Sequence, residues 1–187
     1  EGSGRLAEMS TTALKAVRFR ATRDRMMTLG ELCGFVAGRA TLVIELKSHF
    51  DGDRRLVQRC ADVLANYAGP VAVMSFDPAM IELVRWIAPH LTRGIVAERH
   101  YAHYEWDLMP AAEKRSMAFL LHAARSRPQF IAYSVKDLPA LAPLAAHALF
   151  RLPLLTWTVR SAADRQAAAR WADQMIFEGW RPRAGAT

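Results

Sequence analysis

Two charged residues, Glu45 and Lys47, interrupt an otherwise apolar stretch at residues 41–47. Side chains alternate between the two faces of a β-strand, so a strand here places both charges on one face and three aliphatic side chains on the other. A charge carried into a buried sheet is costly unless it is paired or bound to a metal. The pattern therefore predicts either a salt bridge at a strand end or a cation or phosphate site at the mouth of a barrel.

The composition limits the classes of protein that fit. The chain has 187 residues, enough for one domain or a large part of one. Its formal charge is +7, but the arginines are spread along the sequence, so we expect a cationic surface that favours anionic substrates, and no nucleic-acid partner. No run of about 18 apolar residues occurs, so no integral membrane segment is expected. Cys33 and Cys60 lack metal-type spacing and are expected to be buried free thiols of a cytoplasmic protein.

Short apolar runs alternate with helical patterns along the chain. We expect strands at residues 41–47, 71–75, 93–97, 129–133, 153–159 and 174–178. A strand-then-helix repeat with short connections indicates a parallel sheet covered by helices. The glycine-rich turn of a doubly wound sheet is absent, whereas polar or aromatic residues recur at strand ends, where barrels hold their chemistry. The predicted fold class is therefore α/β, a TIM (β/α)8-type barrel that is incomplete, with about six of eight strands and the helices outside.

Other polar and aromatic residues have simpler interpretations. His100 and His103 belong to an aromatic-rich loop and are expected at the surface, whereas His49 lies two residues after Lys47 and is better placed to reach a site. Asp77 precedes a proline and is expected to cap a helix. Trp86 is on an apolar helical face and is expected in the core.

The order of three segments resembles the glycerophosphodiester phosphodiesterase family. The segments are Ile44-Glu-Leu-Lys47, Ser75-Phe-Asp-Pro78 and Leu155-Thr-Trp-Thr-Val159. Residues 2–14 are also similar to the segment that follows the family's histidine–aspartate motif, so the resemblance covers essentially the whole chain. It implies a (β/α)8 barrel that hydrolyses glycerophosphodiesters to an alcohol and glycerol 3-phosphate, with a divalent cation, Mg²⁺ or Ca²⁺, as cofactor.

The resemblance also implies roles for individual residues. Glu45 is implied to be a metal ligand, and Lys47 a catalytic residue that contacts the phosphoryl oxygens. Phe76 and Trp157 are implied to line the alcohol side of the pocket. We add His49 as a candidate for substrate binding because it follows the strand that carries both charges.

The sequence departs from the family pattern at its start. The family's histidine–arginine–glycine motif, its glutamate-x-aspartate pair and its histidine–aspartate motif have no counterpart here. We therefore expect residues 1–187 to be a partial phosphodiesterase barrel domain from which the first two strands of the parent domain are absent. Alone they should have little or no hydrolytic activity, and their open sheet edges should allow self-association.

Two other functions stay open. One is a different barrel enzyme of anionic substrates, such as a lyase in which Lys47 forms a Schiff base. A neighbouring Glu45 would raise the pKa of that amine, which is the wrong direction for a nucleophile. The other is a non-catalytic, degenerate barrel module.

Overall fold

The computed structural model describes residues 8–180, so residues 2–7 of the segment that resembles the family lie outside the described part. The strands are β1 (Leu42–Glu45), β2 (Val71–Ser75), β3 (Thr92–Ala97), β4 (Phe130–Ser134), β5 (Leu154–Val159) and β6 (Gln174–Phe177). The α-helices are α1 (Thr11–Ala16), α2 (Leu29–Val36), α3 (Arg55–Leu64), α4 (Pro78–Ile87), α5 (Ala111–Ala118), α6 (Ala123–Ser126), α7 (Leu141–Phe150) and α8 (Ala162–Trp171). Short 3-10 helices occupy Tyr104–Trp106 and Val135–Asp137.

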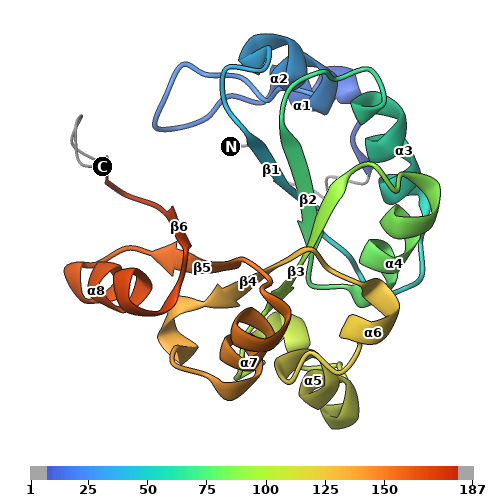
Figure 1. Ribbon diagram of the computed structural model, residues 1–187. Helices are drawn as coiled ribbons and strands as arrows, with labels where there is room; N and C mark the ends of the chain where they lie inside the picture. The colour runs from blue at the N-terminus through green and yellow to red at the C-terminus, as the bar shows by residue number, and fades with distance from the viewer. Residues whose placement is uncertain (1–7, 181–187) are drawn as a thin grey trace.

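The strands form one curled parallel sheet with helices on its outer side (Figure 1). Its order, β1-β2-β3-β4-β5-β6, makes neighbours in the chain neighbours in the sheet, as in a singly wound barrel. Within residues 8–180, β1 and β6 are the two edges and do not pair with each other. This arrangement confirms the predicted fold class, an incomplete (β/α)8-type barrel with the helices outside.

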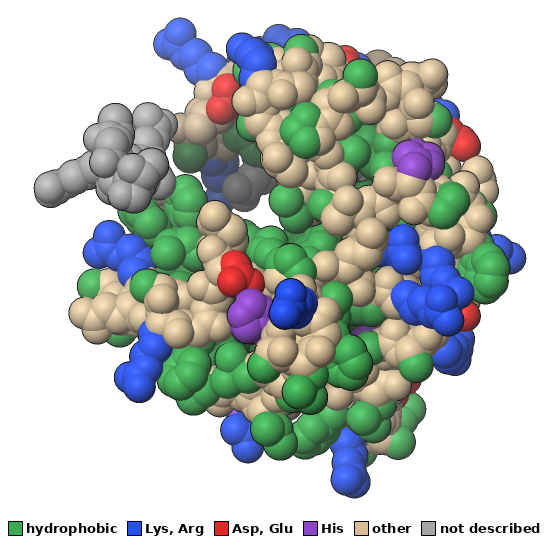
Figure 2. Space-filling view, in the orientation of Figure 1, with side chains coloured by type: hydrophobic (Ala, Val, Ile, Leu, Met, Phe, Trp, Pro, Cys, Tyr) green, Lys and Arg blue, Asp and Glu red, His purple; other side chains and the backbone are tan. Residues whose placement is uncertain are grey.

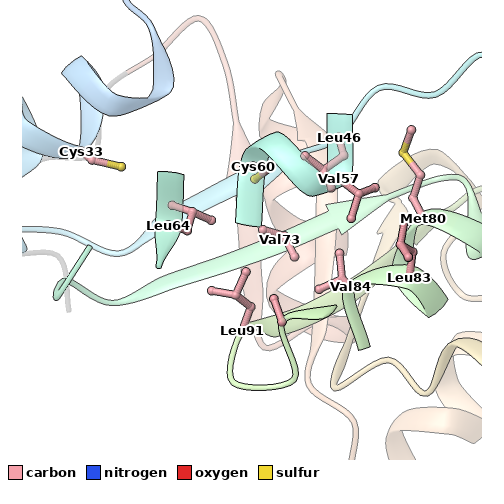
Figure 3. Close-up of a cluster of buried hydrophobic side chains, with 11 residues drawn as sticks. Cys33, Leu46, Val57, Cys60, Leu64, Val73, Met80, Leu83, Val84 and Leu91 are labelled. Carbon is pink, nitrogen blue, oxygen red and sulfur yellow. The ribbon is translucent and has the colours of Figure 1, made fainter. Parts of the chain in front are cut away.

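The outer face of the sheet is fixed by packing against the helices. Leu46, directly after β1, packs against Val57 and Cys60 of α3 and against Val73 of β2 (Figure 3). All four side chains are buried. Burial of a leucine side chain stabilises the fold by about 2 kcal/mol. Because alternate residues point to opposite faces, this packing turns Glu45 toward the inside of the curled sheet.

The inner face has its own apolar layer, formed by side chains from β2, β3 and β4. Ala72, Met74, Val96, Phe130 and Ala132 are buried together there. The Phe130 ring lies over Gly94, where an added Cβ would come within 2.3 Å of the ring. These side chains fill the interior below the strand ends, so the space that remains for a ligand is at the carboxyl ends of the strands.

Local signals in the sequence set several helix boundaries. Asp77 accepts a hydrogen bond from the backbone N–H of Ala79 at 2.8 Å and caps α4, as predicted. Pro143 lies in the first turn of α7, where proline is tolerated.

The structure confirms the prediction for the two cysteines and overturns the prediction for Trp86. Cys33 and Cys60 are buried free thiols, as expected, and burial raises the pKa of Cys60 to about 11. Trp86 is not in the core: its side chain is 66% exposed, because it lies on the outer side of α4, where the Arg85 guanidinium covers its ring at 4.7 Å. Among the described residues, no helix is long and apolar enough to cross a membrane.

His122, just before α6, makes the stability of the fold depend on pH. Burial lowers its pKa to about 4, with the Arg125 cation adding to the shift and the Asp77 carboxylate opposing it. The imidazole Nδ1 lies 3.3 Å from the hydroxyl oxygen of Ser126, which is fully buried. The folded state therefore holds His122 neutral at a pH where an exposed histidine is charged.

We predict that the free energy of unfolding falls as the pH drops from about 6.5 to about 4. In this window the unfolded chain binds a proton at His122 that the folded chain does not, so acid favours unfolding. The loss is on the order of 3 kcal/mol. Urea unfolding followed by tryptophan fluorescence at a series of pH values measures it. The variant His122→Gln should lose this part of the pH dependence, whereas His90→Gln, at an exposed position, should keep it. An unchanged pH dependence in His122→Gln would show that other groups cause it.

Candidate functional site

The ion pair between Glu45 and Lys47 lies at the carboxyl end of β1. Strand β1 ends at Glu45, so Lys47 belongs to the loop that follows and not to the predicted strand. Its Nζ still lies 2.7 Å from Glu45 Oε1. The Lys47 side chain is 80% exposed and that of Glu45 is 26% exposed, so the acid is held in the fold and the base reaches into solvent.

The loop after β1 is fastened to the end of β2 by hydroxyl and carboxylate groups. Ser48 Oγ donates to Asp77 Oδ2 at 2.5 Å and accepts from the backbone N–H of Phe50 at 2.9 Å. The buried Ser75 hydroxyl donates to the backbone carbonyl of Leu46 at 2.7 Å. Asp77 thus caps α4 and also holds the loop, a second role that the sequence did not reveal.

The loop and an aromatic cluster enclose a pocket of about 500 Å³. It is lined by residues 45–50, Phe76, Glu105 and Trp106. His49 belongs to this lining and its side chain is exposed. The structure therefore brings four of the five predicted site residues to one pocket, namely Glu45, Lys47, His49 and Phe76.

Trp157, the fifth predicted residue, reaches the pocket through Phe76. The two rings meet edge to face, with centroids 5.4 Å apart. The indole N–H of Trp157 donates to the backbone carbonyl of Ala132 at 3.0 Å, which fixes the ring on the inner side of β5. Phe76 and Trp157 are therefore in contact, as expected for two residues that line one side of a pocket.

The long loop after β3 packs onto this aromatic pair. Trp106 and Tyr101 are buried, and the Trp106 ring lies 5.1 Å from Phe76 and 5.2 Å from Tyr101. His100 and His103 of the same loop are exposed, as predicted, and lie 3.9 Å from Asp137 and 3.7 Å from Glu105, respectively.

Sequence analysis missed Glu98, an acid at the carboxyl end of β3. Glu98 is half-buried, and burial raises the pKa of its carboxyl group, although a hydrogen bond from Trp106 acts in the opposite direction. Trp106 also lines the pocket beside Glu45. The sequence does contain a signal for Glu98: it is an acid directly after an apolar strand, the same pattern that singled out Glu45.

The described residues fit a metal ion only in part. The Oε1 atom of Glu45 is shielded from solvent and, apart from the ion pair with Lys47, finds no hydrogen-bond donor. A carboxylate oxygen of this kind suits a hard cation. Residues 8–180 contain no group of three or more histidine, cysteine, aspartate or glutamate side chains arranged to hold a metal. Glu45 would thus be one ligand of a site that needs further ligands.

We predict that Asp77→Ala lowers the free energy of unfolding by about 1–2 kcal/mol and also loosens the loop after β1. The cap hydrogen bond to Ala79 and the contact with Ser48 are both lost. Urea unfolding measures the first effect, and amide hydrogen exchange at Phe50 the second. The matched control is Ser161→Ala, which removes the cap of α8, far along the chain from this loop. Equal exchange at Phe50 in both variants would refute the second role of Asp77.

Comparison with known proteins supports the fold. No family model matches the sequence, and no curated protein is similar enough to count as a match. A phosphodiesterase of Oleispira antarctica, solved with the product sn-glycerol-3-phosphate, matches with a TM-score of 0.72 at 13% identity, over 94% of this chain and 69% of its own. Glycerophosphodiester phosphodiesterases of Parabacteroides distasonis and Agrobacterium tumefaciens match with TM-scores of 0.67 and 0.65 at 14% and 15% identity. They are covered over 66% and 71% of their length, and this chain over 90% and 94%.

Across six matched structures, the chain spans between 52% and 71% of the other protein's length. At such low identity the likeness concerns the fold. The chain therefore has the fold of the solved glycerophosphodiester phosphodiesterases over about two thirds of their length, as the resemblance of its sequence segments predicted.

Proposed function

We propose that this chain is part of a metal-assisted phosphodiesterase that hydrolyses glycerophosphodiesters to an alcohol and glycerol 3-phosphate, in lipid and glycerol metabolism. The observation that carries the proposal is the ion pair of Glu45 and Lys47, whose carboxylate oxygen Oε1 is shielded from solvent and lies 2.7 Å from Nζ, in a pocket at the carboxyl ends of barrel strands. The likeness to solved phosphodiesterases supports it. The buried free thiols of Cys33 and Cys60 support a cytoplasmic location.

The residues of the pocket suit an anionic phosphodiester. A divalent cation, Mg²⁺ or Ca²⁺, would bind Glu45 together with further oxygen ligands and polarise the phosphoryl group. Lys47, exposed and flexible, contacts the phosphoryl oxygens and offsets the negative charge that develops on them. Phe76 and Trp157 contact the alcohol, and His49 contacts the substrate from the rim of the pocket.

A single carboxylate is a weak holder of Mg²⁺, which needs several oxygen ligands. We therefore expect residues 1–187 alone to release glycerol 3-phosphate at close to the background rate. The remaining ligands would come from residues outside the described part of the chain.

The contact between Glu45 and Lys47 disfavours the Schiff-base alternative. The Lys47 Nζ is held in an ion pair 2.7 Å from a Glu45 carboxylate oxygen, whereas a Schiff base needs an amine that is free to attack a carbonyl carbon. Borohydride with a carbonyl substrate would trap the lysine if that function were correct. A degenerate, non-catalytic barrel would instead release no glycerol 3-phosphate, even in a version extended upstream.

Hydrolysis of glycerophosphocholine tests the proposed function. We predict that a version extended upstream of Glu1 releases glycerol 3-phosphate with Mg²⁺ or Ca²⁺, and that a chelator abolishes the release. Glu45→Gln and Lys47→Met should each lower kcat by about 100-fold, because each removes charge stabilisation from the transition state. Lys136→Met is the matched control, since Lys136 also follows a barrel strand but pairs with Asp164 at 2.6 Å. Full activity in Glu45→Gln would contradict the proposal.

We also propose that residues 1–187 self-associate through the edges of the sheet. Val43 on β1 is 43% exposed and Phe177 on β6 is 40% exposed, and unpaired parallel edges favour pairing with another chain. We predict a concentration-dependent rise in sedimentation coefficient that Val43→Lys on the β1 edge reduces. Phe150→Lys, an exposed apolar position on α7, is the control and should leave it unchanged. A monomer at all concentrations would contradict self-association.

A further inference from the structure

Four arginines gather at the amino ends of β3 and β4, the end of the sheet opposite to the Glu45 pocket. Arg85 is on α4, Arg93 is the second residue of β3, and Arg125 and Arg127 are at the end of α6. Figure 2 shows Lys and Arg side chains gathered over α4 and α6. None of these residues is part of the proposed phosphodiesterase site.

Arg93 is the member of this group with a shielded guanidinium N–H that has no acceptor among the described residues. Its Nε–H is shielded from solvent and donates to no acceptor among the described residues, while its Nη1 donates to Gln129 Oε1 at 3.3 Å. Burial lowers the pKa of Arg93, and the positive charges of Arg85 and Arg127 lower it further. A buried, unpaired donor beside like charges is costly, so the group is incomplete without an anion.

The neighbouring carboxylate does not supply that anion. Glu82 Oε2 is bound by Arg125 Nη2 at 2.6 Å, which neutralises one arginine only. Arg85 Nη1 donates to the backbone carbonyl of Arg125 at 3.0 Å and so stays close to α6. Glu82 is the only carboxylate within the described range that forms an ion pair with these four residues. Arg85, Arg93 and Arg127 therefore have no carboxylate partner among the described residues, and the Arg85 guanidinium has the Trp86 ring beside it.

We propose that Arg85, Arg93 and Arg127 bind the phosphate group of a small phosphate monoester. Guanidinium groups bind phosphate through paired, charge-assisted hydrogen bonds, and a dianion with three free oxygens can engage several of them. A single carboxylate has too few oxygens and too little charge for three guanidiniums.

A groove beside the arginines indicates which part of such a ligand lies next to the phosphate. This groove, about 560 Å³ in volume, lies between α6 and α7 and has Ile95 and Ile131 of the sheet at its base. Its lining is apolar except for Arg127 at one end. When a phosphate binds at Arg127, an apolar substituent of the same molecule therefore lies in the groove, where its burial adds affinity.

Calorimetric titration at constant ionic strength tests the proposal, with inorganic phosphate and hexyl phosphate as probes. We expect hexyl phosphate to bind at least about 10-fold more tightly than inorganic phosphate, since several CH₂ groups become buried. Arg127→Gln and Arg93→Gln should each weaken both probes by about 10-fold or more. Arg165→Gln, an exposed arginine over Trp180, is the matched control and should change neither.

Two further measurements identify the site and the source of the phosphate. The part of the binding that Arg127→Gln removes should persist in Lys47→Gln, because Lys47 lies at the other end of the sheet. If Lys47→Gln abolished binding and Arg127→Gln did not, the phosphate would be in the phosphodiesterase pocket and this proposal would be wrong.

Sedimentation with phosphatidylcholine vesicles, with and without phosphatidic acid, separates the two sources of a phosphate group, a soluble monoester and a lipid head group. If vesicles with phosphatidic acid capture the protein and Arg127→Gln prevents this capture, a lipid head group is also a ligand of the site. If vesicles capture the protein but neither soluble probe binds, the proposal is overturned, because the overall positive charge of the protein then explains the capture.

Discussion

The opposite directions of two adjacent side chains at the end of β1 determine the rest of the site. Leu46 packs into the helix layer beside Val57 and Cys60, so the Glu45 carboxylate must face the inside of the curled sheet. A shift of one residue in β1 would bury the charge among the helices and expose the leucine, at a cost of several kcal/mol. The hydrophobic packing of the outer layer thus positions the acid of the inner one.

The loop after β1 converts this orientation into a pocket. Ser48 and Ser75 hold the loop backbone near Asp77, and the loop in turn places Lys47 beside Glu45. The Phe76 ring, between Ser75 and Asp77 in the chain, forms the opposite wall. The Ser48–Asp77 contact thus serves both the start of α4 and the loop that lines the pocket.

The sequence predicted well what depends on local pattern. The strands, the Asp77 cap and the inward direction of Glu45 follow from apolar runs, one proline and the alternation of side chains. Contacts between distant segments were not predictable in this way. The packing of Trp106 onto Phe76 joins two loops. The pKa of Glu98 is raised first by burial and further by the carboxylates of Asp137 and Glu105, which come from other segments. Trp86 was placed in the core because its helical face is apolar, but no element covers that part of α4 within the described residues.

The central claim is that Glu45 binds a divalent cation inside the curled sheet. Paramagnetic broadening of backbone amide signals by Mn²⁺ tests it most directly, because it locates even a weakly bound ion. Low Mn²⁺ concentrations should broaden the signals of Glu45, Lys47 and Phe76 first, and Glu45→Gln should remove this effect while Glu105→Gln, at the pocket rim, keeps most of it. Broadening that is centred elsewhere, or that persists in Glu45→Gln, would contradict the account.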